Sequence, residues 1–292
     1  LGLPIQRGRV LERIRGRDLD LLVASDRLWA LDRVLGTIPF KGEVQARLLA
    51  YWLGACGDLC PNPLLEGPDS PVLAGTARAC LVRRTEPLPF RVRVRGYLAG
   101  EAWADYQAGR KVSGLNLPEG LRPSEKFPIP LVSPEWEGQE AGEVRSGLWD
   151  ELEELALALF RRGQELASEA GLILVDSSYE FGLVEGRPYV CDLHSLESSH
   201  YWWAPGYPSL FPTVDAQRDL DGEAWRHWLT RQGFDGRGQA PALPDQVRAE
   251  TALAYVQAFE TITGDFFESK GTGPQAEAEA IGRIVERELL GS

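Results

Sequence analysis

The sequence is poor in the residues from which metal centres and disulfide frameworks are usually built. Its 292 residues include no methionine, three histidines and four cysteines. The cysteines form no Cys-x-x-Cys pair, so their spacing assembles no zinc ligand set. We therefore expect scattered, buried thiols of a cytosolic protein at Cys56, Cys60, Cys80 and Cys191.

Positive charge and long apolar runs are also scarce. The chain has 31 Lys and Arg against 43 Asp and Glu, a net charge of -12. Nucleic acids and anionic lipid surfaces need concentrated positive charge, so neither is an expected partner. No apolar run approaches the ~20 residues of a membrane span, and the residues from Leu1 to Pro4 do not resemble a secretory signal. A cytoplasmic location is expected.

The composition is otherwise that of a globular protein with a sizeable core, 43% hydrophobic and 25% charged. Thr85–Pro89 is the expected hinge, because two prolines favour an extended backbone and end regular elements. Helices and strands alternate without regular βαβ units, which predicts an α+β fold. Periodicity predicts strands at 9–14, 21–24, 79–84, 91–97 and 172–175, and helices at 44–53, 149–170, 245–263 and from 275 onward.

The most informative segment runs from Asp176 to Asp192. Residues 178–184 and 188–193 read as two strands around a three-residue loop, Glu185-Gly186-Arg187. This register places Glu180 opposite Asp192 on one face, with Cβ atoms about 4.5–5.5 Å apart. Facing carboxylates repel, and Mg²⁺ between them would remove the repulsion. A two-residue loop would instead put the two acids on opposite faces. The alternative to a metal site is a pair of solvated surface acids.

Motifs spread along the chain give this segment a context. The sequence resembles the SAICAR synthetase family, whose members join aspartate to a carboxylated aminoimidazole ribotide. The resemblance covers nearly the whole chain in order and spacing. It rests on Gly8–Val10, Asp26–Asp32, Lys41–Glu43, Pro61–Leu65, Val94–Trp103, Leu117–Leu121, Ser124–Lys126, Gly171–Asp176, Glu180–Leu183, Gly233–Gly236 and Tyr255–Gly264.

The resemblance implies a two-lobed fold and a site for ATP and Mg²⁺. Residues 1–88 would form an antiparallel-sheet lobe that covers ATP, and residues 89–292 a larger α+β lobe with the metal and substrate sites. Glu180 and Asp192 match the magnesium-binding acids, with Asp176 as a supporting catalytic acid. The remaining ATP contacts would come from Arg9 at the phosphates and from the hinge residues Arg84, Glu86 and Leu88.

The substrate pocket departs from the family pattern. Arg95 keeps one of the residues that hold the ribotide phosphate, and Ser199 keeps its place beside another. Glu101 replaces a serine and His200 replaces an arginine, and both changes disfavour a phosphate. A family lysine has also become Glu137.

The implied reaction is attack of a substrate carboxylate on the γ-phosphate of ATP, followed by displacement of phosphate by an amine. We expect a carboxylate–amine ligase acting on small molecules, with a substrate that lacks the usual ribotide phosphate. SAICAR synthesis itself and a non-catalytic nucleotide-binding relative are the alternatives. His200 is a candidate base for the amine or an ordinary structural histidine. An assembly of identical chains is left open.

Overall fold

A computed structural model describes residues 3–8, 10–31, 33–136, 146–212, 217–220, 224–234 and 236–291. The chain divides into two compact units, one of Leu1–Gly54, Pro63–Arg84 and Asp221–Ser292, the other of Ala55–Asn62 and Thr85–Leu220. The C-terminal residues thus group with the N-terminal ones. The expected lobe boundary between residues 88 and 89 stays a prediction, although one division of the units falls nearby, after Arg84.

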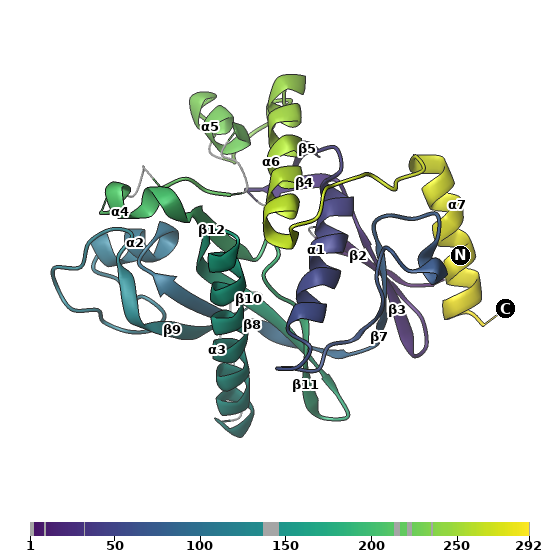
Figure 1. The fold of residues 1–292 in the computed structure, drawn as a ribbon, viewed down its shortest axis with the longest axis horizontal. Coiled ribbons are helices and arrows are strands. Elements are labelled where there is room, and N and C mark those ends of the chain that lie inside the picture. The colour runs from purple at the N-terminus through teal and green to yellow at the C-terminus, as the bar shows by residue number, and fades with distance from the viewer. Residues whose placement is uncertain are drawn as a thin grey trace. The chain divides into compact units, whose positions relative to one another are not determined.

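The first unit is built on an antiparallel sheet of five strands in the order β1-β2-β3-β7-β6 (Figure 1). These are β1 (Ile5–Arg7), β2 (Leu11–Arg15), β3 (Leu19–Ala24), β6 (Leu64–Glu66) and β7 (Ala79–Arg83), with a separate ribbon of β4 (Arg27–Ala30) and β5 (Arg33–Thr37). The helices are α1 (Lys41–Ala55), α5 (Ala224–Arg231), α6 (Asp245–Thr263) and α7 (Pro274–Ile284), with short turns at Pro71–Leu73 and Val285–Leu289.

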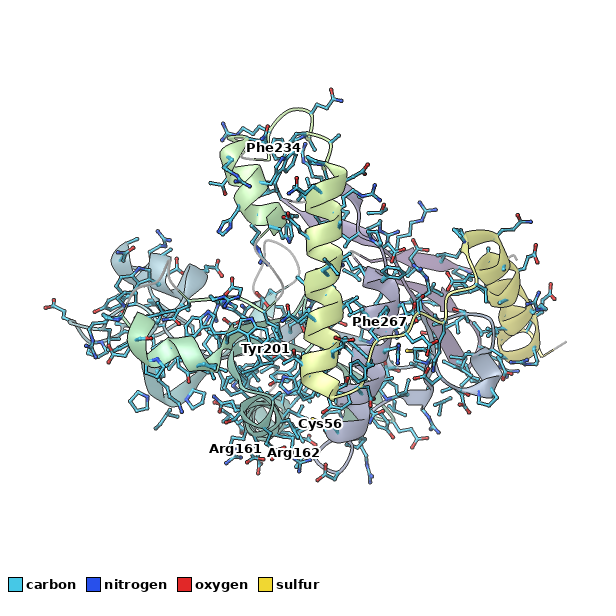
Figure 2. The ribbon with its side chains drawn as sticks, turned by 45° about the horizontal axis from the view of Figure 1, so that its top comes forward. Cys56, Arg161, Arg162, Tyr201, Phe234 and Phe267 are labelled. Carbon is cyan, nitrogen blue, oxygen red and sulfur yellow. The ribbon has the colours of Figure 1, made fainter. Side chains whose placement is uncertain are left out.

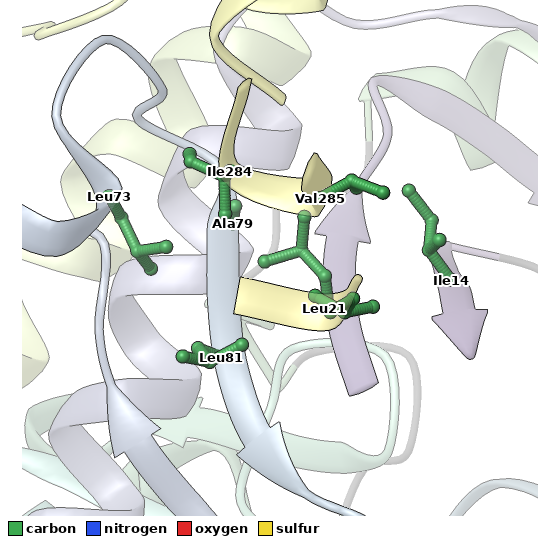
Figure 3. Close-up of a cluster of buried hydrophobic side chains, with 8 residues drawn as sticks. Ile14, Leu21, Leu73, Ala79, Leu81, Ile284 and Val285 are labelled. Atoms are coloured by element: carbon green, nitrogen blue, oxygen red, sulfur yellow. The ribbon is translucent and has the colours of Figure 1, made fainter. Parts of the chain in front are cut away.

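The C-terminal helix completes the core of this sheet. Buried side chains from β2, β3 and β7 pack against Ile284, Val285 and Leu289 (Figure 3). Burying such side chains contributes roughly 1.5–3 kcal/mol each. The sheet strands alternate apolar residues on this face, and the helix from the far end of the sequence covers them.

The second unit is built on an antiparallel sheet in the order β11-β10-β8-β9, with β12 also paired to β10. This unit carries most of the predicted site residues. The strands are β8 (Glu86–Tyr97), β9 (Lys126–Trp136), β10 (Leu172–Val184), β11 (Arg187–Asp192) and β12 (Ser199–Trp203). The helices are α2 (Gly100–Gln107), α3 (Ser146–Glu169) and α4 (Tyr207–Leu210), with a turn at Ala204–Gly206.

Helix α3 packs on one face of this sheet, against β8 and β10 (Figure 1). Alternation along β8 explains the choice of face: Phe90, Val92 and Val94 are buried, whereas the arginines between them are half-buried. Arg162 of α3 donates to the Ala55 carbonyl at 2.9 Å and binds Asp58, which fastens segment 55–62 to the helix (Figure 2).

A close contact between α3 and the end of β11 fixes the strand that carries Asp192. His194 is fully buried, and its Nε2 donates to the Leu159 carbonyl at 3.1 Å. A Cβ atom at Gly163 would lie 2.4 Å from the imidazole Cε1. Burial lowers the pKa of His194 to about 4. Only glycine at 163 lets the neutral ring lie against the helix.

The predicted helices and strands are present in the structure, with differences at the hinge and in the loop of the 178–193 hairpin. Helix 245–263 is confirmed residue for residue as α6, and the α+β fold is confirmed. The prediction that the prolines of Thr85–Pro89 end an element is wrong, because β8 runs through Pro87 and Pro89. Here β8 pairs only with β10, and pairing with β9 begins at Phe90, so this edge tolerates residues without an N–H. All four cysteines are free thiols. Cys56, Cys60 and Cys80 are buried, as expected, whereas Cys191 is half-buried, so the prediction of burial is wrong for this residue.

Candidate active site

The hairpin of β10 and β11 pairs Glu180 with Asp192, as predicted, but its turn differs from the prediction. Val184 pairs with Arg187, so the loop has two residues, Glu185 and Gly186, with φ of 51° and 80°. Positive φ at both positions is the type I′ geometry. This turn alone would set Glu180 opposite Cys191. A bulge makes Cys191 the extra residue and restores the pairing with Asp192.

These two residues, the acid pair, lie beside a single arginine. Arg91 is the β8 partner of Glu180, and its Nη2 donates to Glu180 Oε1 at 2.5 Å. Asp192 Oδ2 accepts a long hydrogen bond from Ser195 at 3.4 Å. Burial, followed by the Glu180 charge, raises the pKa of Asp192 from 3.8 to about 7. The acid pair therefore holds more negative charge than Arg91 neutralises.

The acid pair fits Mg²⁺ on two counts. The ionised form of a carboxylate whose pKa is raised by desolvation and by a neighbouring negative charge is stabilised by a divalent cation. Mg²⁺ typically uses one or two carboxylates and completes its shell with water and phosphate. Glu180 and Asp192 would hold it.

We call the side of the sheet that carries the arginines of β8 the site face. Its middle is a hydrogen-bonded group around Arg93. Its guanidinium donates to Asp176 Oδ1 at 2.7 Å and to Ser178 Oγ at 3.1 Å, and pairs with Glu135 at 3.5 Å. Ser178 also donates to Glu135 at 2.8 Å. Asp176 is 10% exposed, so its charge is compensated by Arg93 rather than by water. Its expected catalytic role stays a prediction.

At the substrate end, Arg95 is surrounded by serines and one acid. It donates to Ser113 Oγ at 3.0 Å and Ser133 Oγ at 3.4 Å. Glu101, in the first turn of α2, places Oε2 3.7 Å from Arg95 Nη2. Burial and the Arg93 charge lower the pKa of Arg95. The charge of Arg95 is therefore shared with Glu101.

His200 closes the same end from β12, where it pairs with Asp176. Its Nε2 lies 2.6 Å from Asp219 Oδ1, and its Nδ1 lies 3.8 Å from Asp176 Oδ2. The ring also meets the edge of Trp202, with 5.5 Å between centroids. The neighbouring Ser199 shares a 2.7 Å hydrogen bond with Ser177. His200 thus stands between two carboxylates.

The other predicted contacts belong to the first unit, to the start of β8, or to residues outside the described part of the chain. Arg84 lies in the first unit, where its Nη1 donates to the Gly16 carbonyl at 3.2 Å. Glu86 and Leu88 lie at the start of β8, exposed and half-buried. Arg9 and Glu137 lie outside the described residues. Their roles remain predictions.

Four residues of the face were not predicted as site residues: Arg91, Arg93, Glu135 and Asp219. A signal for two of them exists in the sequence. Arg91, Arg93 and Arg95 alternate along one strand with the same period as Asp176, Ser178 and Glu180, and the register sets the two series side by side. Asp219 has no such signal, because it reaches His200 from an irregular segment.

Comparison with known proteins places this geometry in a family. The family model of SAICAR synthetase matches residues 6–242. The phosphoribosylaminoimidazole-succinocarboxamide synthase of Bacteroides fragilis is 38% identical, covering 92% of this chain and 89% of the relative. The enzyme of the same name from Methylibium petroleiphilum is 36% identical, covering 89% and 95%.

Solved structures agree. The SAICAR synthase of Saccharomyces cerevisiae, complexed with SAICAR, superposes with a TM-score of 0.82 at 28% identity, covering 91% of this chain and 97% of that one. A SAICAR synthetase in complex with ADP shares the fold, with a TM-score of 0.66 at 20% identity over 91% and 100%. No helix among the described residues is long and apolar enough to cross a membrane. With its family model matched over most of its length, the chain belongs to the SAICAR synthetase family of ATP- and Mg²⁺-dependent, ADP-forming carbon–nitrogen ligases.

Proposed function

We propose that this ligase activates a small-molecule carboxylate that lacks the ribotide phosphate, and couples it to an amine. One observation carries the proposal. Arg95, the one arginine kept at the ribotide-phosphate site, and His200, which replaces the other, are each paired with a carboxylate, Glu101 and Asp219 respectively.

The electrostatics of the substrate end support this. A phosphate binds where positive charge is in surplus. A phosphate on Arg95 would stand close to Glu101, and two unit charges about 4 Å apart repel by roughly 4 kcal/mol at an effective dielectric near 20. A protonated His200 would still face Asp219 and Asp176. This end therefore offers a dianion no net attraction.

The acid pair end suits the first chemical step. Bound there, Mg²⁺ would neutralise charge on the transferring phosphoryl group. Glu180 and Asp192 would hold the ion, and Arg91 would keep Glu180 oriented. The substrate carboxylate attacks the γ-phosphorus, ADP leaves, and the amine then displaces phosphate from the acyl phosphate to give the amide. Asp176 would lie on the same strand as Glu180, with its charge held by Arg93.

SAICAR synthesis is the second candidate, with aspartate and the carboxylated aminoimidazole ribotide as substrates. It is favoured by relatives of that name at 38% and 36% identity over most of the chain. In that case Arg95 would leave Glu101, which is 76% exposed and can turn into solvent.

ADP release separates the two candidates. With aspartate, the dephosphorylated riboside is expected to react at least as well as the ribotide. A Glu101→Ser, His200→Arg double variant is expected to favour the ribotide by about tenfold or more, since it restores a charge-assisted contact and removes a repulsion. Efficient turnover of the ribotide by the parent protein, weakened in the double variant, would establish the second candidate instead.

A further inference from the structure

We propose that Arg91 is a positioning residue that limits the acid pair to one divalent cation, which binds together with the nucleotide. This rests on the proposed assignment of Glu180 and Asp192 to the metal. It does not depend on which carboxylate the enzyme activates.

The geometry of Arg91 restricts what Glu180 can offer. Arg91 lies directly across from Glu180 in the β8–β10 ladder, and its guanidinium holds Oε1 at 2.5 Å. Both side chains are about one-third exposed, 31% and 35%. Charge-assisted hydrogen bonds of this length are the strong ones. Glu180 is therefore left with its second oxygen for a metal, which gives monodentate ligation.

The charge balance points the same way. Two carboxylates with one guanidinium leave a single negative charge where a divalent ion would sit. Among the described residues, no third His, Cys, Asp or Glu joins the acid pair as a metal ligand. Arg93, the next arginine along β8, is committed to Asp176, Ser178 and Glu135. The missing charge and ligands must come from the nucleotide phosphates, which supply both.

Arg91 also fills the place that a second ion would need. A second divalent ion shared by this acid pair would bind the outer oxygen of Glu180, and that oxygen already accepts from the guanidinium. A fixed positive charge at this position repels a further cation. The arginine thus performs permanently the neutralisation that a second metal would otherwise supply.

Calorimetric titration with Mn²⁺, with and without ADP, tests the proposal on the whole chain. The parent protein is expected to bind one Mn²⁺ per chain with ADP, and at least about tenfold more weakly without it. Arg91→Gln removes the charge but keeps a polar side chain. It is expected to bind Mn²⁺ without ADP about tenfold or more tighter than the parent, because a unit charge a few ångströms away is lost.

A matched control removes an arginine charge from the hairpin that carries the acid pair. Arg187 is an exposed residue of β11, and Arg187→Gln is expected to leave Mn²⁺ affinity within about threefold. If Arg91 served only to hold the sheet together, its loss would loosen the acid pair and weaken Mn²⁺ binding. Unchanged or weaker binding in Arg91→Gln therefore overturns the proposal.

Two further measurements keep the outcomes distinct. Binding of two Mn²⁺ ions per parent chain with ADP would also overturn the proposal. This measurement uses the parent protein alone, so it does not depend on the folding of a variant. Glu180→Ala tests the underlying assignment: retained Mn²⁺–ADP binding would remove the acid pair from the metal site altogether. Loss of binding in Glu180→Ala with no change in Arg91→Gln would reject the role of Arg91 alone.

Discussion

The two ends of the site face are built differently. At the acid pair end, Glu180 and Asp192 are ladder partners whose neighbours include the buried Leu193 and His194. At the substrate end, Glu101 projects from α2 with 76% of its side chain exposed, and Asp219 comes from an irregular segment. One end is fixed by the backbone ladder, and the other is set by side chains that can move.

This difference matches the demands on each end. An ion of fixed charge and size tolerates little displacement of its ligands. A substrate pocket needs a charge pattern that fits one molecule, and loops and helix ends supply it. Substitution in the acid pair should therefore lower catalysis, and substitution at the substrate end should alter substrate preference.

The largest expected effect separates the two ends directly. Glu180→Gln removes a carboxylate from the proposed metal site and should lower the rate of ADP release by about 10³-fold. Glu101→Gln makes the same chemical change at the substrate end and should leave the rate with the cognate substrate within about tenfold. Steady-state ADP release measures both. Equal losses would erase the distinction between the ends.

Next in size is the anchoring of β11 on α3. Gly163→Ala places a Cβ against His194 and Leu174, with contacts of 2.4 and 2.8 Å, and should lower the free energy of unfolding by about 2–3 kcal/mol. Gly147→Ala, on the same helix with open space around it, should be neutral or slightly stabilising. Urea titration distinguishes them. An unaffected Gly163→Ala would mean that His194 can move without consequence.

The sequence predicts more of the acid pair end than of the substrate end, for a physical reason. Period-2 alternation and a turn signal predict that Glu180 and Asp192 face each other. The predicted loop length is wrong, but a bulge at Cys191 restores the pairing. Such local rules cannot find Asp219, whose contact with His200 depends on the path of an irregular segment. Nor do they show that residues after 221 complete the N-terminal core.

A titration effect follows from Asp192. Its pKa is raised from 3.8 to about 7 in the folded protein, so the folded state binds the extra proton between these values. Its ionisation therefore destabilises the metal-free protein as pH rises from about 4 to 7, and the effect is constant above 7. Asp192→Asn should be more stable than the parent at pH 8, by about 2 kcal/mol after allowing for solvent screening.

The advantage of Asp192→Asn should shrink toward pH 4. Denaturation in the presence of a chelator at several pH values measures it. Glu101→Gln, at an exposed acid of the substrate end, is the control variant. A constant difference across this pH range would argue against the burial of the Asp192 charge.

The smallest effects are expected from Glu101→Gln, on the free energy of unfolding and on the affinity for inorganic phosphate. Its free energy of unfolding should stay within about 0.5 kcal/mol of the parent, as for other exposed side chains. Inorganic phosphate should nevertheless bind several-fold tighter, because Arg95 no longer faces a carboxylate. Calorimetry with phosphate measures this. Glu119→Gln, at another exposed acid of the same unit, is the control and should change neither quantity.

The alternating arginines of β8 limit how such an enzyme can diverge. Arg91 and Arg93 each tie β8 to a neighbouring strand, and Arg95 ties it to Ser133 of β9. Replacing any of them to admit a new substrate would also remove a cross-brace of the sheet. The charge preference of the substrate end can therefore change with little loss of stability only through the acids that face these arginines. Glu101 is such an acid, and its replacement leaves the sheet intact.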